Sequence, residues 1–496
     1  MIDLGSNTAR VLVADVTSEG LVHVVDEEAV ALELGRELAG EGQFSDRLLM
    51  RVLEVLEDFT LIARAAGAES IVAVGTAALR ASSNASALLR IAERRLGVTI
   101  EVVDGDEEAR LAFEGALFSL PEQDGLLLDL GGGSIEVVEF RARRLQRAWS
   151  LPLGALRIAD RFFASDPPAP ADVRAARRYI RRVLTAANLP SLGPGDALVG
   201  TGGSIRNLAR IDRRRQRYPI GRLQGYPLPV ARLRRSMPRL LGVDAATRAA
   251  TPGLNPDRAH TILGGALVLE AVAQHVGASD IITAGEGLRE GRARNLLAGK
   301  LPSLARVRQA AFAQMHAALP AAARVRMEHL AALSVALHGA LNAEADTLDV
   351  LQDATALIEL GGSLDFYNRG SRASEIVLAA GMPGFSHREV ARIAAVLRLT
   401  EREDAALGSL RPLVRAEEHL ALRRCAAILV LADAILRRTS PDRVGEIEVT
   451  STGDTLLISV PVWPRRTADA PTARVRAQFG LDVVISSQTN RQLPTK

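Results

Sequence analysis

Three glycine-rich turns carry the clearest chemical signal in this sequence. Each follows an apolar run, and they read Asp3-Leu4-Gly5-Ser6-Asn7, Asp129-Leu130-Gly131-Gly132-Gly133-Ser134 and Gly200-Thr201-Gly202-Gly203-Ser204. Any one of them alone could be an ordinary tight turn. Glycine, however, lets the backbone approach a phosphate closely, and successive backbone N–H groups can surround an anion. The set therefore predicts a phosphate site, with added side-chain donors from Ser6, Asn7, Thr201 and Ser204.

Carboxylates stand beside two of these turns. Asp3 and Asp129 end their strands just before the glycines, and Glu136 follows Asp129 by seven residues, on the opposite arm of a predicted hairpin. Carboxylates next to a phosphate site can hold a hard divalent cation such as Mg²⁺, which neutralises phosphate oxygens. A solvated turn residue is the alternative. We predict Asp3, Asp129 and Glu136 as metal ligands.

A further acidic group opens a predicted helix at Asp106-Glu107-Glu108-Ala109-Arg110. Acidic residues in a first turn often only balance the helix dipole. Alternatively, one of these carboxylates faces the phosphate and takes a proton from water. The local pattern does not choose between Glu107 and Glu108.

Alternating strands and helices must position these groups. Hydrophobic periodicity predicts strands at 9–16, 21–25, 70–75, 99–104, 125–130, 135–140, 197–199 and 281–283, with helices at 46–66, 85–96 and 107–118. The segment around Asp129 echoes the segment around Asp3, which suggests two related lobes that each open with a hairpin. A helix starting near Ile205 points its positive end at the third turn.

The character of the chain changes after Lys300. Residues 303–440 are rich in Ala, Leu and Arg with helical periods, and residues 446–461 return to strand-like alternation. We therefore expect four parts, namely residues 1–118, 119–298, 299–443 and 444–496.

Composition excludes several classes of protein. Hydrophobic residues make up 48% of the 496 residues and charged residues 24%, so the chain is not disordered. The single cysteine, Cys425, excludes a disulfide framework and a Cys-rich zinc module. Aromatic residues are only 3%, which argues against a nucleic-acid partner held by base stacking. Interrupted apolar runs and the lack of a leader predict a soluble, cytoplasmic protein without a membrane partner.

Five motifs in order make the resemblance to a known family specific. They are Ile2-Asp3-Leu4-Gly5-Ser6-Asn7-Thr8, Val74-Gly75-Thr76-Ala77-Ala78-Leu79-Arg80, Glu107-Glu108-Ala109-Arg110, Asp129-Leu130-Gly131-Gly132-Gly133-Ser134-Ile135-Glu136 and Glu286-Gly287-Leu288-Arg289-Glu290-Gly291. The chain resembles the long form of the exopolyphosphatase / guanosine pentaphosphate phosphohydrolase (Ppx/GppA) family. The resemblance implies a two-lobed α/β part like that of actin, sugar kinases and heat-shock chaperones, which is ribonuclease H-like. An all-α HD-like domain and a small α+β C-terminal module would follow.

The resemblance also implies a reaction and its residues. The family hydrolyses a terminal phosphoanhydride in a cleft between two lobes, with Mg²⁺ or another divalent cation. Its essential base matches Glu108, and its metal and catalytic carboxylates match Asp129 and Glu136. Substrate-binding positions match Ser6, Asn7, Arg80, Gly131, Gly132, Gly133, Ser134, Gly202, Gly203 and Ser204.

The helical region departs from an HD phosphohydrolase. Leu357-Ile358-Glu359-Leu360-Gly361 stands where a His-Asp pair is expected, so we do not expect a second metal centre there. We expect this region to bind substrate or to build a homodimer.

The leading hypothesis is therefore an exopolyphosphatase acting on inorganic polyphosphate. Hydrolysis of pppGpp to ppGpp, the alarmones of the stringent response, is the alternative within the family. A kinase of the same fold and a non-catalytic polyphosphate binder are alternatives of other classes. A basic run from Arg213 to Arg222 could steer a polyanion toward the third turn.

Overall fold

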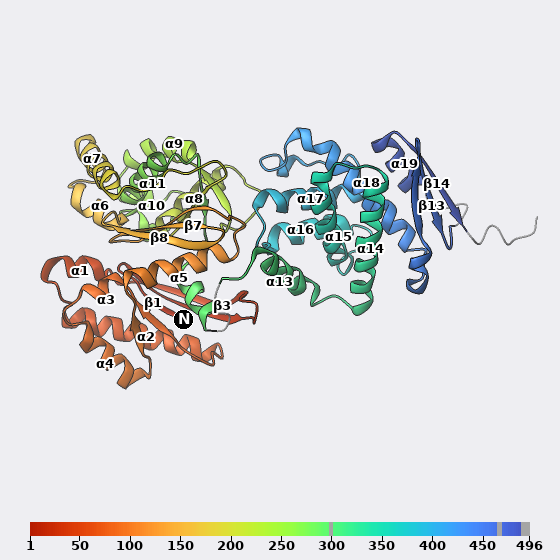
Figure 1. Ribbon diagram of the computed structural model, residues 1–496. Coiled ribbons are helices and arrows are strands. Elements are labelled where there is room, and N and C mark those ends of the chain that lie inside the picture. The colour runs from red at the N-terminus through yellow and green to blue at the C-terminus, as the bar shows by residue number, and fades with distance from the viewer. Residues whose placement is uncertain (297–300, 464–468, 488–496) are drawn as a thin grey trace, which may run out of the picture. The chain divides into compact units, whose positions relative to one another are not determined.

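The computed structural model describes residues 1–296, 301–463 and 469–487 and divides into two compact units (Figure 1). The first unit comprises Met1–Arg217 and Arg222–Val307, and the second comprises Tyr218–Gly221 and Arg308–Lys496. The boundary that we predicted between residues 298 and 299 lies outside the described residues, as do residues 488–496 of the predicted C-terminal module.

The first lobe of the first unit is built on a five-stranded sheet of order β3-β2-β1-β4-β5. Its strands are β1 (Ile2–Leu4), β2 (Thr8–Val16), β3 (Val22–Ala31), β4 (Ala73–Gly75) and β5 (Ile100–Val102). Its helices are α1 (Leu34–Glu41), α2 (Asp46–Ala65), α3 (Ala77–Ala81) and α4 (Ala85–Leu96). Apolar side chains of α2 and α4 pack on the sheet to form its core.

The second lobe carries a six-stranded sheet of order β10-β11-β9-β6-β7-β8. Its strands are β6 (Gly125–Leu130), β7 (Ile135–Arg141), β8 (Arg144–Leu151), β9 (Ala197–Thr201), β10 (Tyr226–Pro229) and β11 (Asp280–Thr283). Its helices are α6 (Ala155–Phe162), α7 (Pro170–Ala187), α8 (Gly203–Arg215), α9 (Val230–Leu241), α10 (Ala245–Ala249), α11 (Ile262–Val276) and α12 (Leu288–Asn295).

The two lobes share one topology. In each, the first strand pairs antiparallel with the second and parallel with the fourth, and the second pairs antiparallel with the third. The parallel pairing of β4 with β5 has its counterpart in β9 with β11. The second lobe adds β10 at its edge. The two-lobed α/β fold that the repeated turn predicted is confirmed.

Helix α5 (Gly105–Phe118) connects the lobes and packs on the sheet of the second. It crosses α12 closely at Gly115 and Gly291, where no side chain fits. A Cβ on Gly115 would lie 1.8 Å from the Gly287 carbonyl oxygen, and one on Gly291 would lie 2.0 Å from that of Leu111. This crossing fixes the first turn of α5, which carries Glu108, relative to the segment that begins α12.

The second unit is mainly helical and has its own core. Its helices are α14 (Ala321–Ala340), α15 (Leu348–Gly362), α16 (Arg369–Ala380), α17 (His387–Glu401) and α18 (His419–Leu436), and α13 (Leu304–His316) leads into it. A three-stranded sheet follows, with β12 (Glu448–Thr452), β13 (Thr455–Val460) and β14 (Asp482–Ser487), and α19 (Asp469–Phe479) connects the parallel pair β13 and β14. A large helical region followed by a small β-containing module was predicted and is confirmed.

The sequence pattern did not predict β8, β10 and β14, and β3 runs to Ala31, beyond its predicted end at residue 25. The third strand of each lobe, β3 and β8, is largely exposed, so its side chains show little of the alternation that marks a half-buried strand. Edge strands tolerate charged residues, and β3 contains Asp26, Glu27 and Glu28.

None of the helices in the described part of the chain is long and apolar enough to cross a membrane.

Candidate functional site

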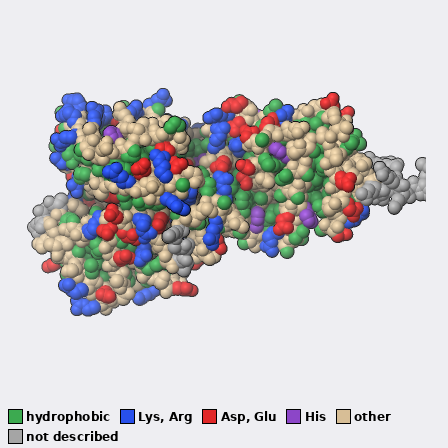
Figure 2. Space-filling view, in the orientation of Figure 1, with side chains coloured by type: hydrophobic (Ala, Val, Ile, Leu, Met, Phe, Trp, Pro, Cys, Tyr) green, Lys and Arg blue, Asp and Glu red, His purple; other side chains and the backbone are tan. Residues whose placement is uncertain are grey.

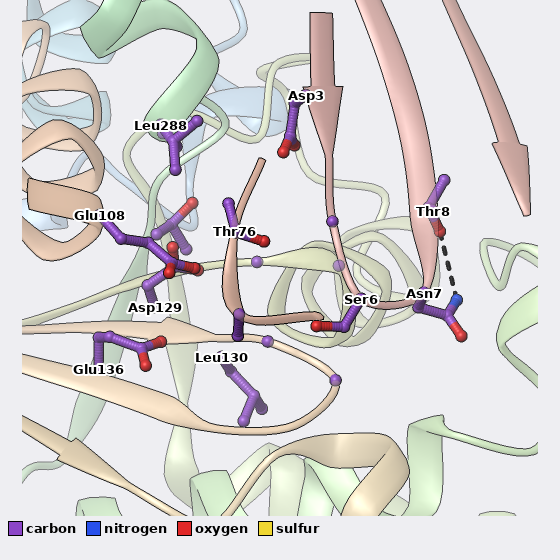
Figure 3. Close-up of a pocket in the computed structure, with 18 of the residues that line it drawn as sticks. Asp3, Ser6, Asn7, Thr8, Thr76, Glu108, Asp129, Leu130, Glu136 and Leu288 are labelled. Atoms are coloured by element: carbon purple, nitrogen blue, oxygen red, sulfur yellow. Dashed lines mark hydrogen bonds between the residues drawn. The ribbon is translucent and has the colours of Figure 1, made fainter. Parts of the chain in front are cut away.

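The three glycine turns meet at one polar cavity of about 150 Å³ in the first unit (Figure 3). We call it the first cavity. The structure brings most of the predicted site residues to its wall: Asp3, Ser6, Asn7, Glu108, Asp129, Gly131, Gly132, Gly133, Ser134, Glu136, Gly202 and Gly203. These residues come from segments that lie far apart in the sequence. The repeated strand-and-turn pattern predicted that the turns would converge, and the structure brings them together at this cavity.

Matching hydrogen bonds close the first two turns. The Gly5 N–H donates to the Thr8 carbonyl at 3.3 Å, and the Gly131 N–H donates to the Ser134 carbonyl at 3.1 Å. The third turn presses against the second strand end, because a Cβ on Gly202 would lie 2.5 Å from the Leu130 carbonyl oxygen. Gly202 also has a φ of +106°, a conformation that other residues rarely adopt. This position requires glycine.

The carboxylates of Glu108, Asp129 and Glu136 point toward one another across the first cavity (Figure 3). Asp129 and Glu136 are directly opposite each other in the β6–β7 ladder, as their seven-residue spacing indicated. Burial raises the pKa of Asp129 to about 7, and the neighbouring Glu136 adds to that shift. Burial also raises the pKa of Glu136 above its usual range, although Ser134 and Ser150 donate to its Oε1 at 2.7 and 3.0 Å.

Glu108 and Glu107 differ in their surroundings. The Asp104 side chain caps α5 by accepting from the Glu107 N–H at 2.8 Å, and Glu107 itself pairs with Arg110. Glu108 lines the first cavity, and its side chain is only 15% exposed. Burial raises the pKa of Glu108 to about 8, with the Glu136 charge as the next cause. The structure thus separates two glutamates that the local sequence left equivalent.

The predicted metal ligands do not form a complete protein cage. Among the residues that the structure describes, no three His, Cys, Asp or Glu side chains are arranged to hold a metal ion. The facing pair Asp129 and Glu136 supplies two carboxylates, whereas Asp3 faces Arg10 across the β1–β2 ladder. Mg²⁺ is commonly held by one or two carboxylates together with water and substrate phosphates. The donor set therefore fits a cation that is completed by phosphate oxygens.

Four arginines also line the first cavity, namely Arg10, Arg206, Arg258 and Arg289. Arg289 lies within the fifth sequence motif, and no pattern predicted a site role for any of the four. Burial lowers the pKa of Arg206 to about 9 and that of Arg258 to about 10, and Arg10 is a further cause at both positions. A signal for Arg10 existed. It follows Asp3 by seven residues, the same spacing that relates Glu136 to Asp129.

Two predicted substrate contacts lie elsewhere. Arg80 lines a neighbouring cavity and donates from Nη1 to Glu108 Oε2 at 2.9 Å and to the Val103 carbonyl at 2.6 Å. The Ser204 side chain is buried where α8 packs against α11. The contact is close, since a Cβ on Gly265 of α11 would lie 2.5 Å from the Ser204 Oγ. The basic run that begins at Arg213 ends α8, and Arg213 lies about 15 Å along the helix from the turn that begins it.

In the second unit, Glu359 stands in an ion-pair cluster. Arg326 pairs with Glu359 at 3.1 Å and also with Asp433. Arg369 and Arg437 pair with the same Asp433, the latter at 3.0 Å. Guanidinium groups neutralise these two carboxylates.

Comparison with known proteins matches the first unit. The family model described as the Ppx/GppA phosphatase family matches residues 12–299. Exopolyphosphatase 2 of Mycobacterium tuberculosis is 31% identical over 286 residues, which cover 55% of this chain and 89% of the relative. Exopolyphosphatase 1 of Mycobacterium leprae is 29% identical over 295 residues, covering 59% and 87%.

Solved structures agree with these matches. An exopolyphosphatase from Cytophaga hutchinsonii aligns with a TM-score of 0.54 and 27% identity, covering 60% of this chain and 96% of that one. The Aquifex aeolicus member of the Ppx/GppA family aligns with a TM-score of 0.53 and 25% identity, with the same coverage. The chain therefore belongs to the Ppx/GppA phosphatase family.

Proposed function

We propose that this protein is an exopolyphosphatase, which hydrolyses the terminal phosphoanhydride of inorganic polyphosphate and releases orthophosphate. The observation that carries the proposal is the largely buried Glu108 carboxylate in a cavity walled by three glycine turns. Such a cavity pairs a proton acceptor for water with donors for a phosphoryl group. The names of the mycobacterial relatives support the same reaction.

Glu108 is the proposed general base. A base is most effective when its pKa lies near the working pH, and burial raises the pKa of Glu108 to about 8. In the proposed step, water gives a proton to Glu108 and its oxygen bonds to the terminal phosphorus. The bridging P–O bond breaks, and its electron pair stays on the shortened chain. Phosphoryl transfer of this kind depends mainly on positioning and charge stabilisation.

The turns and the arginines of the first cavity are the proposed phosphate ligands. Backbone N–H groups of the turns and the guanidinium groups of Arg206 and Arg258 would carry the charge of the terminal phosphoryl group. Arg80 touches the base and lines the adjoining cavity, so we keep it as a proposed substrate ligand. The proposed contacts from the turns are Ser6, Asn7, Gly131, Gly132, Gly133, Ser134, Gly202 and Gly203.

Asp129 and Glu136 are the proposed ligands of Mg²⁺ or another divalent cation, with Asp3 nearby on β1. When bound, the cation would supply positive charge against the phosphate oxygens. Burial raises the pKa of both carboxyl groups, and at Asp129 the charge of Glu136 adds to the shift. Cation binding would favour their ionised forms and release protons.

Phosphate release tests the proposal. Long-chain polyphosphate and pppGpp would be compared, with Mg²⁺ or EDTA, for the wild type, Glu108→Gln and the control Glu107→Gln. We expect metal-dependent release from polyphosphate that Glu108→Gln lowers at least about a hundredfold and Glu107→Gln leaves nearly intact. Activity on pppGpp alone would assign the alarmone reaction. Phosphoryl transfer to an added acceptor without hydrolysis would assign a kinase, and binding without turnover a polyphosphate binder.

A homodimer is a further proposal, which concerns the second unit. What supports it is a stretch of exposed apolar side chains between α15 and α16, where Leu364 is 68% exposed and Tyr367 is 88% exposed. Exposed apolar patches often mark interaction surfaces. Light scattering of the wild type and of Leu364→Ser/Tyr367→Ser would test it, and a monomeric wild type would refute it.

A further inference from the structure

A second cavity, of about 780 Å³, shares a wall with the first. The residues common to both are Ser6, Ala77, Gly132, Gly133 and Ser134. Pockets that hold a whole small molecule usually measure roughly 300–1,000 Å³. The first cavity, at about 150 Å³, is below that range, whereas the second lies within it. The first cavity can enclose the reacting end of a substrate, and the remainder must continue beyond it.

Arginines dominate the charge of the second cavity. Its lining includes Arg36, Arg80, Arg157 and Arg161, with Asp160 as an opposing charge. Asp160 already contacts His260 at 3.0 Å, and among the described residues Arg36 pairs only with an exposed Glu33. The side chain of Arg157 makes no hydrogen bond or ion pair within the part of the chain that the structure describes. The guanidinium groups of Arg36 and Arg157 are available to an anion.

The arginines are fixed to the phosphate turns by backbone hydrogen bonds. In the first lobe, the Gly35 N–H donates to the Ser6 carbonyl at 2.7 Å, which attaches α1 and its Arg36 to the first turn. In the second lobe, the Arg157 N–H donates to the Gly132 carbonyl at 3.0 Å, which attaches α6 to the second turn.

The same arrangement therefore occurs once in each lobe. Helices α1 and α6 lie at the same end of the first unit (Figure 1) and line the second cavity together. On α6, Arg157 and Arg161 are four residues apart and share one face. The Arg161 guanidinium lies 4.3 Å from the centre of the Tyr179 ring, which limits its freedom.

The distribution of charge on the surface does not by itself identify the second cavity as a site for an anion. Basic side chains are spread over the visible face of the first unit with acidic ones among them (Figure 2). The predicted basic run at Arg213 lines neither cavity. The cavity shared with the phosphate turns is a stronger criterion than density of positive charge.

We propose that the second cavity binds the phosphates on the leaving side of the scissile bond, with Arg36 on one wall and Arg157 and Arg161 on the other. This inference rests on the proposed exopolyphosphatase function and names the subsite that would give it a preference for long chains. Guanidinium groups bind phosphate oxygens through paired, charge-assisted hydrogen bonds. Two facing walls of arginine would hold a polyanion while the turns hold its end.

The test compares two double variants with the same spacing. Arg157→Ala/Arg161→Ala removes the proposed contacts on α6, and Arg235→Ala/Arg239→Ala removes an exposed arginine pair on α9 that lines neither cavity. We expect the α6 variant to raise KM for long-chain polyphosphate about tenfold, as two partly exposed charge pairs allow. KM for tripolyphosphate should rise much less, and the α9 variant should leave both values unchanged.

Further arms separate the explanations. Arg157→Lys/Arg161→Lys should recover only part of the affinity for long chains, because lysine keeps the charge but not the paired hydrogen bonds. Equal effects on long chains and tripolyphosphate, or an equal effect of the α9 variant, would overturn the subsite. A KM increase for pppGpp without one for polyphosphate would also overturn it and assign the cavity to a nucleotide. A wild type that releases no phosphate from polyphosphate would instead refute the proposed function itself.

Discussion

Glu108 carries a carboxylate that is removed from most of its water and placed near two others. Burial and the charge of Glu136 both disfavour its ionised form, and the Arg80 guanidinium opposes them. The outcome is a raised pKa of about 8. Groups with such perturbed pKa values in a cavity are candidates for chemistry, and they usually reduce the stability of the fold.

Glu108→Gln should therefore stabilise the protein in a pH-dependent way when EDTA is present. Because the folded-state pKa of Glu108 is raised from 4.5 to about 8, its contribution to the free energy of unfolding falls as pH rises through that interval. The Glu108→Gln variant has no ionisable side chain at this position, so its free energy of unfolding does not fall for this reason. We expect its advantage to be small at pH 5 and about 1–3 kcal/mol at pH 8.5. Denaturant unfolding at both pH values measures it, with Glu107→Gln as a control that should show no such gain.

Arg80→Ala should move the pH dependence of the reaction. Arg80 lowers the pKa of Glu108 through its hydrogen bond and its charge, so its removal should raise that pKa further. An opposite charge as close as the 2.9 Å between Arg80 Nη1 and Glu108 Oε2 typically shifts a pKa by about 1 unit or more. The rising limb of the plot of kcat/KM against pH should shift to higher pH by a similar amount. Arg80→Lys should shift it less. An unchanged profile with a lower kcat would mean that Arg80 acts on substrate alone.

At the scale of elements, the close crossing of α5 and α12 holds the proposed base in place. Gly115→Ala would put a Cβ 1.8 Å from the Gly287 carbonyl oxygen, so the helices must separate. We expect a loss of about 1–3 kcal/mol in the free energy of unfolding and a lower kcat. Gly105→Ala, in the same helix, meets no heavy atom within 4 Å and should change little. Equal stability of the two variants would contradict the argument.

The sequence predicted the elements that are marked by a local pattern of spacing or repetition. The hairpin spacing placed Asp129 opposite Glu136, and the repeated turn indicated two lobes with one topology. Exposed β8 has no alternation to detect, so it was missed. Arg258 reaches the first cavity from a segment without any glycine motif, and only tertiary packing against the third turn identifies it. The ion pair between Arg80 and Glu108 likewise depends on the approach of two distant elements.

At the scale of the whole molecule, two units with separate cores share one chain. The family match ends at residue 299, within the first unit, and the first cavity is lined by residues of that unit alone. The ion-pair cluster around Asp433 lies in the second. Separate cores usually unfold in separate transitions. Each unit should therefore respond to changes in its own interactions.

Asp433→Asn should lower only the transition of the second unit in a calorimetric scan. Asp433 is 5% exposed and pairs with three half-buried arginines, of which Arg326 and Arg369 also pair with Glu359. Its loss leaves the cluster with excess positive charge, at a cost of about 1–3 kcal/mol. Glu446→Gln breaks an exposed pair with Arg443 and should cost less than about 1 kcal/mol. Inorganic phosphate, binding the first cavity, should raise the other transition only. A single transition that shifts with both Asp433→Asn and phosphate would show that the two units unfold as one.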